Sequence, residues 1–409
     1  MVQEDSSYPS FKRLMTPIFY PINAWEKRKL GEISDIRGGG TPSTSKPEYW
    51  DGEIDWYAPA EIGTQRYVSG SRRQITNLGL NKSSATMLPA NKTILFTSRA
   101  GIGNAAILTK SGATNQGFQS IVVEPATDVY FLYSEIPEIK RKAIRLAAGS
   151  TFLEISGKSL SKIQIWLPSF KEQSRIGHLF LQIDNLIAAT QDKLEKLSIL
   201  QRGFLQHFFA QTWRFSGYSH VWENHRLGDV ATRVRGNDGR MNLPILTISA
   251  GKGWLTQEQR FSQNIAGNEL KKYTLLSKGE LSYNHGNSKL AEYGAVFVLK
   301  QFKEALVPRV YHSFNVSGKA DPDFIEYLFE SGVPNHELRK LISSGARMDG
   351  LLNINYDSFM NISVLLPSIE EQNKIARVLE KLKKLTDETR LRLFNLQQAK
   401  KSLLRMLFP

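Results

Sequence analysis

The sequence predicts an α+β protein with an internal repeat, in which two β-rich domains are separated by two long helices. Two observations predict this architecture. Segments near the start and the end of the first half recur in the second half at an offset of about 200 residues, and each closing segment carries an apolar stripe about 40 residues long. The stretches between them are β-prone and share little sequence.

The opening segment of each half is marked by a tryptophan. Residues 25–32 (WEKRKLGE) match residues 222–229 (WENHRLGD) at an offset of 197, and Trp, Glu, Leu and Gly are kept. The closing segments match more closely, because residues 167–176 and 366–375 are identical at six of ten positions at an offset of 199. We therefore interpret the chain as a tandem duplication.

The closing segments are predicted to be helices. Pro168 and Pro367 are followed by acidic residues and then by apolar residues spaced alternately by four and three, which is typical of a helix start leading into a heptad stripe. The first stripe is Ile176, Phe180, Ile183, Ile187, Thr190, Leu194, Leu197, Gln201, Phe204 and Phe208, and the second is Ile375, Leu379, Leu382, Thr386, Thr389, Leu393, Leu396, Lys400, Leu403 and Leu407.

An amphipathic helix usually packs on its own domain. Two helices of equal length, each about 60 Å long at about 1.5 Å per residue, are longer than a compact domain of roughly 140 residues. Each stripe therefore needs a partner, and chain order predicts an antiparallel intramolecular coiled coil with a pseudo-twofold repeat. The predicted division is an N-terminal extension (1–24), a first β-rich domain (25–165), a first helix (166–210), a second domain (222–362) and a second helix (363–409).

The two domains contain short β-prone runs separated by Gly-rich and Asn-rich turns. These runs are 92–96, 121–123, 293–299 and 306–311. They predict α+β domains with twisted, mostly antiparallel sheets. The duplicated helices and the divergent domains together suggest a common frame that carries two domains with different binding targets.

Composition favours a polyanionic partner. The formal net charge is +14 and the calculated pI is about 9.6, which favours nucleic acid or an anionic membrane surface. No apolar stretch approaches the ~18 residues of a spanning helix, so nucleic acid is the better interpretation. There are no cysteines, which excludes disulfides and thiolate metal sites, so we expect a cytoplasmic protein without a structural metal.

The sequence lacks the motifs that an enzyme acting on DNA would need. It has no GxxxxGK[ST] phosphate loop, no [DN]PP[YF] methyltransferase motif and no HExxH. Residues 43–46 (STSK) and 159–162 (SLSK) satisfy SxxK, but neither has the companion motifs of a serine nucleophile. Residues 38–40 (GGG) suit either a phosphate nest or a plain turn.

Side chains suited to DNA occur beside glycines in both domains. Arg and Lys read guanine, Asn and Gln read adenine, and many donors bind phosphate. For each residue taken singly, a solvated surface position is the alternative. The candidates are Lys46, Arg72, Arg73, Arg99, Asn115, Gln116 and Gln119 in the first domain, and Arg233, Arg235, Asn237, Lys252, His285, Asn287, Lys289, Arg309 and Arg347 in the second.

Taken together, these features resemble the specificity subunits of Type I restriction and modification systems. The resemblance covers the chain from Trp25 to Phe408. Its features are the 25–32 segment, residues 39–43 (GGTPS) followed by 54–56 (IDW), residues 115–117 (NQG), and the two LPSxxEQ helix starts.

The resemblance implies two target recognition domains that each read half of a split double-stranded DNA site. It also implies two spacer helices that set the gap and dock two modification (methyltransferase) subunits. Those subunits would bind S-adenosylmethionine and methylate adenine, and restriction subunits would use ATP and Mg²⁺ to translocate and cleave DNA. The chain itself would be no enzyme and hold no cofactor.

Two other functions remain open. A DNA methyltransferase or nuclease with its own site would show a cofactor pocket with an acidic ribose-binding residue. A stand-alone duplicated DNA-binding regulator, or a decoy for the enzymes, would lack exposed apolar docking faces on the helices.

Overall fold

The computed structural model describes residues 25–149, 153–260, 267–286, 289–316, 318–342 and 352–408. The N-terminal extension (1–24) and the candidates Asn287 and Arg347 lie outside the described residues. The described chain divides into two compact units. The first unit runs to Thr190 and resumes at Arg392, and the second unit is residues 191–391.

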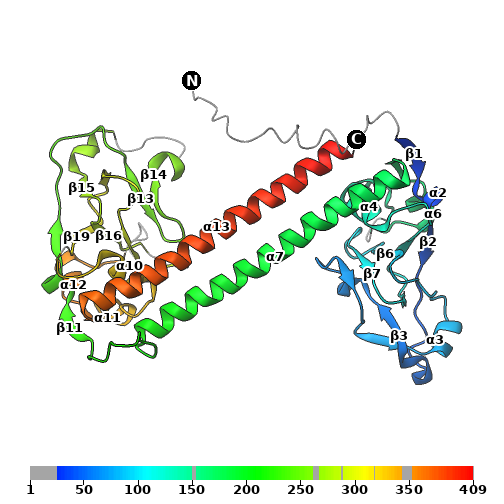
Figure 1. Cartoon of the computed structure of the whole chain (residues 1–409), viewed down its shortest axis with the longest axis horizontal. Coiled ribbons are helices and arrows are strands. Elements are labelled where there is room, and N and C mark those ends of the chain that lie inside the picture. Colours follow the sequence, from blue (N-terminus) through cyan, green and yellow to red (C-terminus); the bar gives the residue numbers. More distant parts are fainter. Residues whose placement is uncertain are drawn as a thin grey trace. The chain divides into compact units, whose positions relative to one another are not determined.

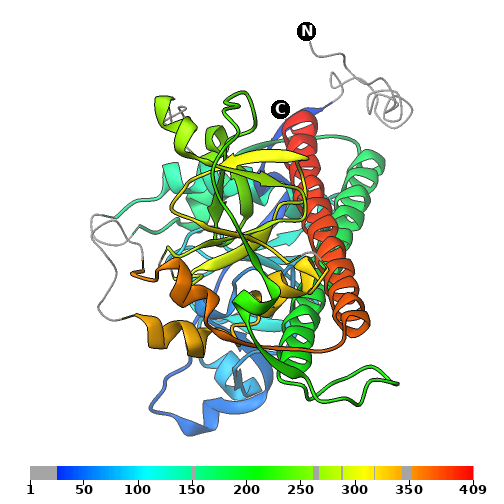
Figure 2. The ribbon, with the colours of Figure 1, turned by 90° about the vertical axis from the view of Figure 1, so that its left-hand side faces the viewer.

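Two long helices carry the chain between the units. They are α7 (Phe170–Phe209) and α13 (Ile369–Leu407), each an unbroken ribbon in Figures 1 and 2. Both begin later than the predicted boundaries 166 and 363, because the residues just before them form strands. A residue before proline is held in extended backbone, so the helices start only after Pro168 and Pro367.

The first unit contains a five-stranded sheet (order β2-β9-β6-β7-β4), a three-stranded sheet (β5-β3-β8) and the pair β1-β10. Among its described strand pairs, β3 with β8 and β4 with β7 are parallel and the others antiparallel. Its elements are β1 (Glu26–Lys29), α2 (Leu30–Ile33), β2 (Ser34–Gly38), η2 (Pro47–Tyr49), β3 (Trp50–Tyr57), η3 (Pro59–Glu61), β4 (Tyr67–Val68), β5 (Arg73–Ile75), α3 (Asn77–Asn81), β6 (Thr93–Phe96), β7 (Ala105–Leu108), β8 (Gly112–Thr114), β9 (Gln119–Val123), α4 (Val129–Ser134), α5 (Ile136–Leu146), α6 (Gly157–Ser161) and β10 (Gln164–Leu167).

The second unit has a four-stranded antiparallel sheet (β12-β19-β16-β17) and three two-stranded pairs, β11-β20, β13-β14 and β15-β18. The predicted strand 306–311 ends early, at Val307, because Pro308 has no N–H for a sheet ladder. The elements are β11 (Glu223–Arg226), α8 (Leu227–Val230), β12 (Thr232–Val234), β13 (Leu246–Ser249), β14 (Gly253–Thr256), α9 (Gln257–Arg260), η4 (Gly267–Lys272), β15 (Thr274–Ser277), β16 (Leu281–Asn284), β17 (Ala295–Val298), β18 (Glu304–Val307), β19 (His312–Asn315), α10 (Pro322–Glu330), α11 (Asn335–Leu341), α12 (Tyr356–Met360) and β20 (Ser363–Leu366).

The same frame supports both units although their sheets differ. A buried glutamine at the start of each long helix accepts a hydrogen bond from the backbone N–H of the residue that caps a short helix. Gln173 accepts from Asp128, the N-cap of α4, at 3.0 Å, and Gln372 accepts from Asp321, the N-cap of α10, at 3.0 Å. Beside each glutamine, the four-residue pairs β1-β10 and β11-β20 have equivalent register.

Each unit combines the start of one long helix with the end of the other. In the first unit, Phe408, the residue directly after α13, stacks on Phe180 of α7, with ring centroids 5.8 Å apart, and Trp25 packs against Phe408 at 6.1 Å. In the second unit, Phe209 from the end of α7 packs against Trp222 at 6.3 Å. The helices therefore pass each other in opposite directions within each unit.

The predicted stripe residues differ in burial along the helices. Ile176, Phe180, Ile375 and Leu379 are at most 1% exposed and belong to the unit cores, and Leu197 is also buried. Phe208 and Leu403 are buried as well, and the remaining predicted apolar positions on the stripes are half-buried: Ile183, Ile187, Leu194, Phe204, Leu382, Leu393, Leu396 and Leu407.

Glu135, between α4 and α5, is a buried carboxyl group in the first unit. Only 4% of the residue is exposed, and it lines a cleft next to Leu404 of α13 and Phe408, which directly follows that helix. Burial raises the pKa of Glu135 to about 8. The positive charge of Lys142 lowers this pKa, but its effect is smaller than that of burial. The folded chain therefore holds a proton here at neutral pH, which the unfolded chain releases.

We expect Glu135→Gln to stabilise the chain at pH 7 by about 3 kcal/mol and to change little at pH 4.5. The group's folded pKa lies above its unfolded value, so the wild-type chain loses stability as the pH rises from about 4.5 to about 8. Chemical denaturation at several pH values measures this slope. Glu138→Gln is the control. In the wild-type chain the hydrogen bond from Arg141 lowers the pKa of Glu138, so replacing this carboxylate should not stabilise the chain at pH 7. Parallel pH profiles for wild type and Glu135→Gln would contradict the assignment.

Candidate nucleic-acid interface

A glycine-rich loop (residues 38–45) organises the candidate side chains of the first unit. The indole of Trp56 donates to the carbonyl oxygen of Gly40 at 2.8 Å, and the indole of Trp50 donates to that of Ser43 at 3.1 Å. A Cβ at Gly39 would collide with the carbonyl oxygens of the 114–115 backbone, so this close approach requires glycine. The backbone N–H of Gly40 is used by the carbonyl of Thr114 and is not available for a phosphate.

The loop meets the turn at residues 115–117. The side chain of Asn115 accepts a hydrogen bond from the N–H of Gly117 at 2.8 Å, and the hydroxyl of Thr41 donates to Oε1 of Gln116. Ser98 donates its backbone N–H to the carbonyl of Gly117 at 2.8 Å, which brings the neighbouring Arg99 to the same turn. The structure thus places Asn115 and Gln116 in this turn, and Arg99 follows a residue that is hydrogen-bonded to it.

Two basic candidates lie on the other side of the loop. Arg73 is exposed, and its guanidinium lies 3.6 Å from the ring centroid of Trp50. Lys46 follows the loop and pairs loosely with Glu48 at 3.9 Å. Arg72 is exposed, and Gln119 is half-buried in β9 beside Gly38.

The candidates of the second unit are more dispersed. Lys252 lines a cleft of about 940 Å³ between β17, α10 and the middle of α13 (residues 380–390), and Lys289 precedes Leu290, another lining residue. Arg235 is exposed after β12, and Arg309 is exposed in the turn after β18. Arg233 is exposed, and its guanidinium lies 4.0 Å from the ring centroid of Tyr356.

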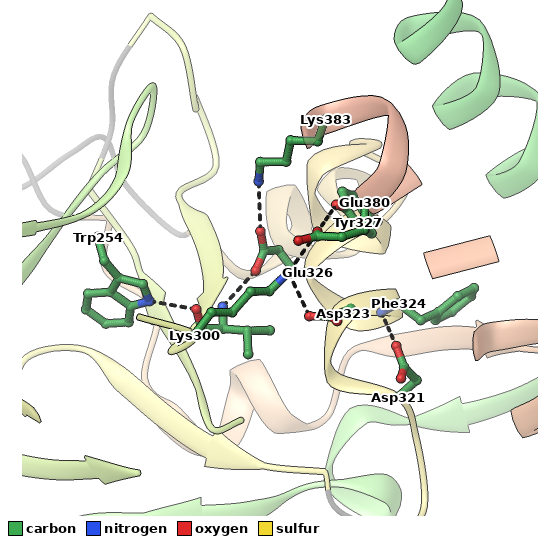
Figure 3. Close-up of polar contacts among 10 residues, drawn as sticks. Trp254, Lys300, Asp321, Asp323, Phe324, Glu326, Tyr327, Glu380 and Lys383 are labelled. Atoms are coloured by element: carbon green, nitrogen blue, oxygen red, sulfur yellow. Dashed lines mark hydrogen bonds and ion pairs between the residues drawn. The ribbon is translucent and has the colours of Figure 1, made fainter. Parts of the chain in front are cut away.

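A charged network forms one wall of this cleft (Figure 3). Glu326 of α10 is 3% exposed, and it accepts the N–H of Val298 at 2.9 Å and the ammonium of Lys383 at 3.2 Å. Lys300 bridges Asp323 at 2.9 Å and Glu380 at 3.0 Å. Burial opposes the charge of Lys300, but these carboxylates outweigh it and raise its pKa. The network therefore ties α10 and the sheet to α13.

His285 is a correction to the predicted DNA contacts. It is 5% exposed, and its ring nitrogens face the carbonyl oxygens of Leu352 at 2.7 Å and Val310 at 3.0 Å. Its ring stacks on His312 at 4.9 Å, and burial lowers the pKa of His312 to about 4. His285 is a core residue whose polar atoms are already used, so it cannot reach DNA from this position.

Asn237 is also used by the fold. Its amide donates to the carbonyl oxygens of Arg240 at 3.0 Å and Leu270 at 3.3 Å. An amide held in this way does not read a base. The neighbouring glycines in the sequence suggested that Asn237 lies in a loop with a free side chain. The sequence could not show the bond to Leu270, because that residue is 33 positions away.

Sequence reasoning did not select the aromatic platforms Trp50 and Tyr356 as site residues. Each lies under an exposed arginine. The sequence does place aromatic residues in the polar, glycine-rich stretches that contain the basic candidates. It does not show which arginine stacks on which ring, because the two members of each pair are distant in sequence. Only the tertiary fold brings Arg233 to Tyr356.

The SxxK serines have no activating base among their hydrogen bonds in the described chain. Ser43 bonds Ser45 at 2.9 Å, and Ser159 bonds Ser156 at 3.0 Å. Within the described residues, no group of three or more His, Asp and Glu side chains could hold a metal ion. No helix in that part of the chain is long and apolar enough to cross a membrane.

Comparison with known proteins finds similar proteins of one kind. Residues 22–198 match the model of the Type I restriction modification DNA specificity domain. The MjaIX specificity subunit of Methanocaldococcus jannaschii is 32% identical over 222 residues, which is 50% of this chain and 51% of that protein. The EcoR124I/EcoR124II specificity subunit of Escherichia coli is 29% identical over 42% of this chain and 44% of its own length. The chain thus spans about half the length of these curated relatives.

Longer but more distant similarities extend over nearly the whole chain. The MjaVIII specificity subunit of M. jannaschii is 24% identical over 94% of this chain and 92% of its own length. The crystal structure of a Type I restriction-modification S subunit from M. genitalium shares the fold, with a TM-score of 0.60 at 15% identity, over 94% of this chain and 96% of that one. In the family-model match of residues 22–198 and in the sequences of these relatives, the chain is therefore similar to Type I restriction-modification specificity subunits, and it shares the mixed α+β fold with two long helices.

Proposed function

We propose that this chain selects a bipartite double-stranded DNA site for a Type I restriction-modification complex, and that it docks two methyltransferase subunits and, through them, restriction subunits. One observation carries the proposal. The two units share a hydrogen-bonded frame, with Gln173 and Gln372 in matching roles, but differ in sheet topology. A frame used twice suits two identical partners, and two different sheets suit two different half-sites.

The charge of the chain supports DNA as the ligand. The net charge is +14, and exposed cationic side chains gather at loops in both units. In this proposal, residues 25–165 and 222–362 are the target recognition domains. Lys46, Arg72, Arg99 and Gln116 supply contacts to one half-site, and Arg233, Arg235, Lys252, Lys289 and Arg309 supply contacts to the other.

The helices are proposed to set the distance between the half-sites. Their opposite directions within each unit support an antiparallel coiled coil along the whole length of α7 and α13. Lys400 of α13 also pairs with Asp184 of α7 at 2.6 Å, in line with that register. A stiff rod of this kind would relate the two domains by a pseudo-twofold axis and fix the spacer length.

Matched apolar residues on the two helices support the docking of two copies of one partner. Leu186 of α7 and Leu385 of α13 occupy equivalent repeat positions, and they are 39% and 38% exposed. Both lie outside the heptad stripes. In this proposal each helix presents the same contact to one methyltransferase subunit. S-adenosylmethionine, ATP and Mg²⁺ are assigned to the partner subunits, and no catalytic residue to this chain.

The whole proposal is tested by single-molecule sequencing of DNA from cells that express the chain with its modification subunit. We expect methyladenine in a split motif with a constant gap, because each domain reads one half. The motif should vanish when the chain is omitted. A motif that persists without the chain would contradict the proposal and favour a stand-alone regulator.

Lengthening both helices by one heptad is expected to widen the gap. Seven residues inserted after Asp192 in α7 and after Leu391 in α13, each copying the preceding heptad, add about 10 Å of helix, or about three base pairs of DNA. The methylated motif should keep its bases. The control is insertion into one helix alone, which puts the stripes out of register and should abolish methylation. Altered bases at an unchanged gap would refute the assignment of the helices as a ruler.

Charge introduced at the matched leucines is expected to remove one partner at a time. Leu186→Glu and Leu385→Glu should each bind a single methyltransferase subunit by native mass spectrometry, and the double variant none, because each buries a carboxylate in an apolar contact. Ile199→Glu is the control, since Ile199 is 53% exposed but its repeat counterpart is the polar Gln398. Retention of two subunits by the double variant would rule out this docking face.

A further inference from the structure

Trp50 in the first unit is a fixed aromatic surface. It begins β3, is 7% exposed, and packs edge-to-face against Trp56 with ring centroids 5.1 Å apart and an interplanar angle of 89°. Its indole is anchored to the carbonyl oxygen of Ser43 at 3.1 Å. Both tryptophans belong to a small core around the three-stranded sheet, separate from the core that contains the long helices. Their position is therefore set by the glycine loop and this sheet.

Arg73 lies on that surface with its charge uncompensated. Its guanidinium is 3.6 Å from the ring centroid of Trp50 and 5.8 Å from that of Trp56. Among the described residues, no carboxylate lies within ion-pair distance of Arg73, whereas Arg37 pairs with Asp35 at 2.7 Å and Arg141 with Glu138. The residue is nevertheless exposed. A stacked guanidinium of this kind has lost rotamer freedom but still has N–H donors to offer.

That combination suits bidentate recognition of guanine. The planar fork of arginine matches O6 and N7 of guanine in the major groove, and a guanidinium already oriented loses little further freedom on binding. The polar groups around it suit the backbone of the same duplex. Ser43 and Ser45 expose hydroxyl groups on the glycine loop, and Lys46 follows them. Such donors bind phosphates without reading sequence.

We propose that Arg73 reads one guanine of the half-site bound by the first unit, with Trp50 as the positioning residue that orients it. The inference rests on the proposed function and deepens it by naming a base and a side chain. Arg72 differs in the properties that matter. It is also exposed, but no aromatic ring of the described residues contacts its guanidinium and orients it.

The test is competition binding by the complete methyltransferase complex to duplexes in which each base pair of the methylated motif is changed in turn. The wild-type complex should discriminate against a change at one particular guanine of the first half-site by about tenfold or more. With Arg73→Gln, that discrimination should fall to within about twofold while every other position, including the second half-site, is read as before. Arg72→Gln is the matched comparison: as a contact that reads no base, Arg72 should contribute affinity for all duplexes equally, so this variant should bind every duplex more weakly and leave the relative discrimination at each position unchanged.

Trp50 variants separate orientation from mere packing. Trp50→Phe keeps an aromatic surface and should retain most of the discrimination at that guanine, whereas Trp50→Leu should reduce it there and nowhere else. Arg73→Lys keeps the charge without the fork and should behave like Arg73→Gln, which keeps the test valid if the glutamine variant fails to fold.

Three results would overturn the inference. The first is a first half-site without guanine on either strand. The second is unchanged discrimination by Arg73→Gln and Arg73→Lys, and the third is an equal loss of affinity for all duplexes, which marks a phosphate contact. The failure of the proposed function is a different result, namely a wild-type complex that yields no split motif.

Discussion

Each unit of this protein is completed by a helix end from the other half of the chain. Phe408 enters the first core against Phe180, and Phe209 enters the second against Trp222. Buried aromatic rings contribute much of the apolar area of a small core, so neither unit is complete with the residues of its own repeat. The opposite helix directions within each unit follow from this exchange.

The repeat in the sequence was enough to predict the two long helices and the mixed α+β class, because the heptad spacing and the flanking prolines are local signals. The ends of elements depended on details within a few residues. The strands before Pro168 and Pro367 and the early stop at Val307 follow from the backbone limits of proline.

The candidate site was harder to predict, since its geometry depends on contacts between distant residues. His285 stands beside glycine and asparagine in the sequence, yet the carbonyl oxygen that holds its ring belongs to Leu352, 67 residues away. Arg73 and Trp50 meet only because β3 and β5 pair across a bulge. Residue type alone distinguishes none of these environments, whereas burial and hydrogen-bond partners do.

The two cores also differ in when they can form. The second unit is a continuous stretch, residues 191–391, but the first unit needs residues from Arg392 onward as well as those before Thr190. During synthesis the ribosome therefore delivers every part of the second unit before the last part of the first, which reverses the usual order in which the N-terminal domain folds first. A nonsense codon or frameshift after Leu391 would leave the residues of the second unit in place and remove part of the first unit, most of which was translated earlier.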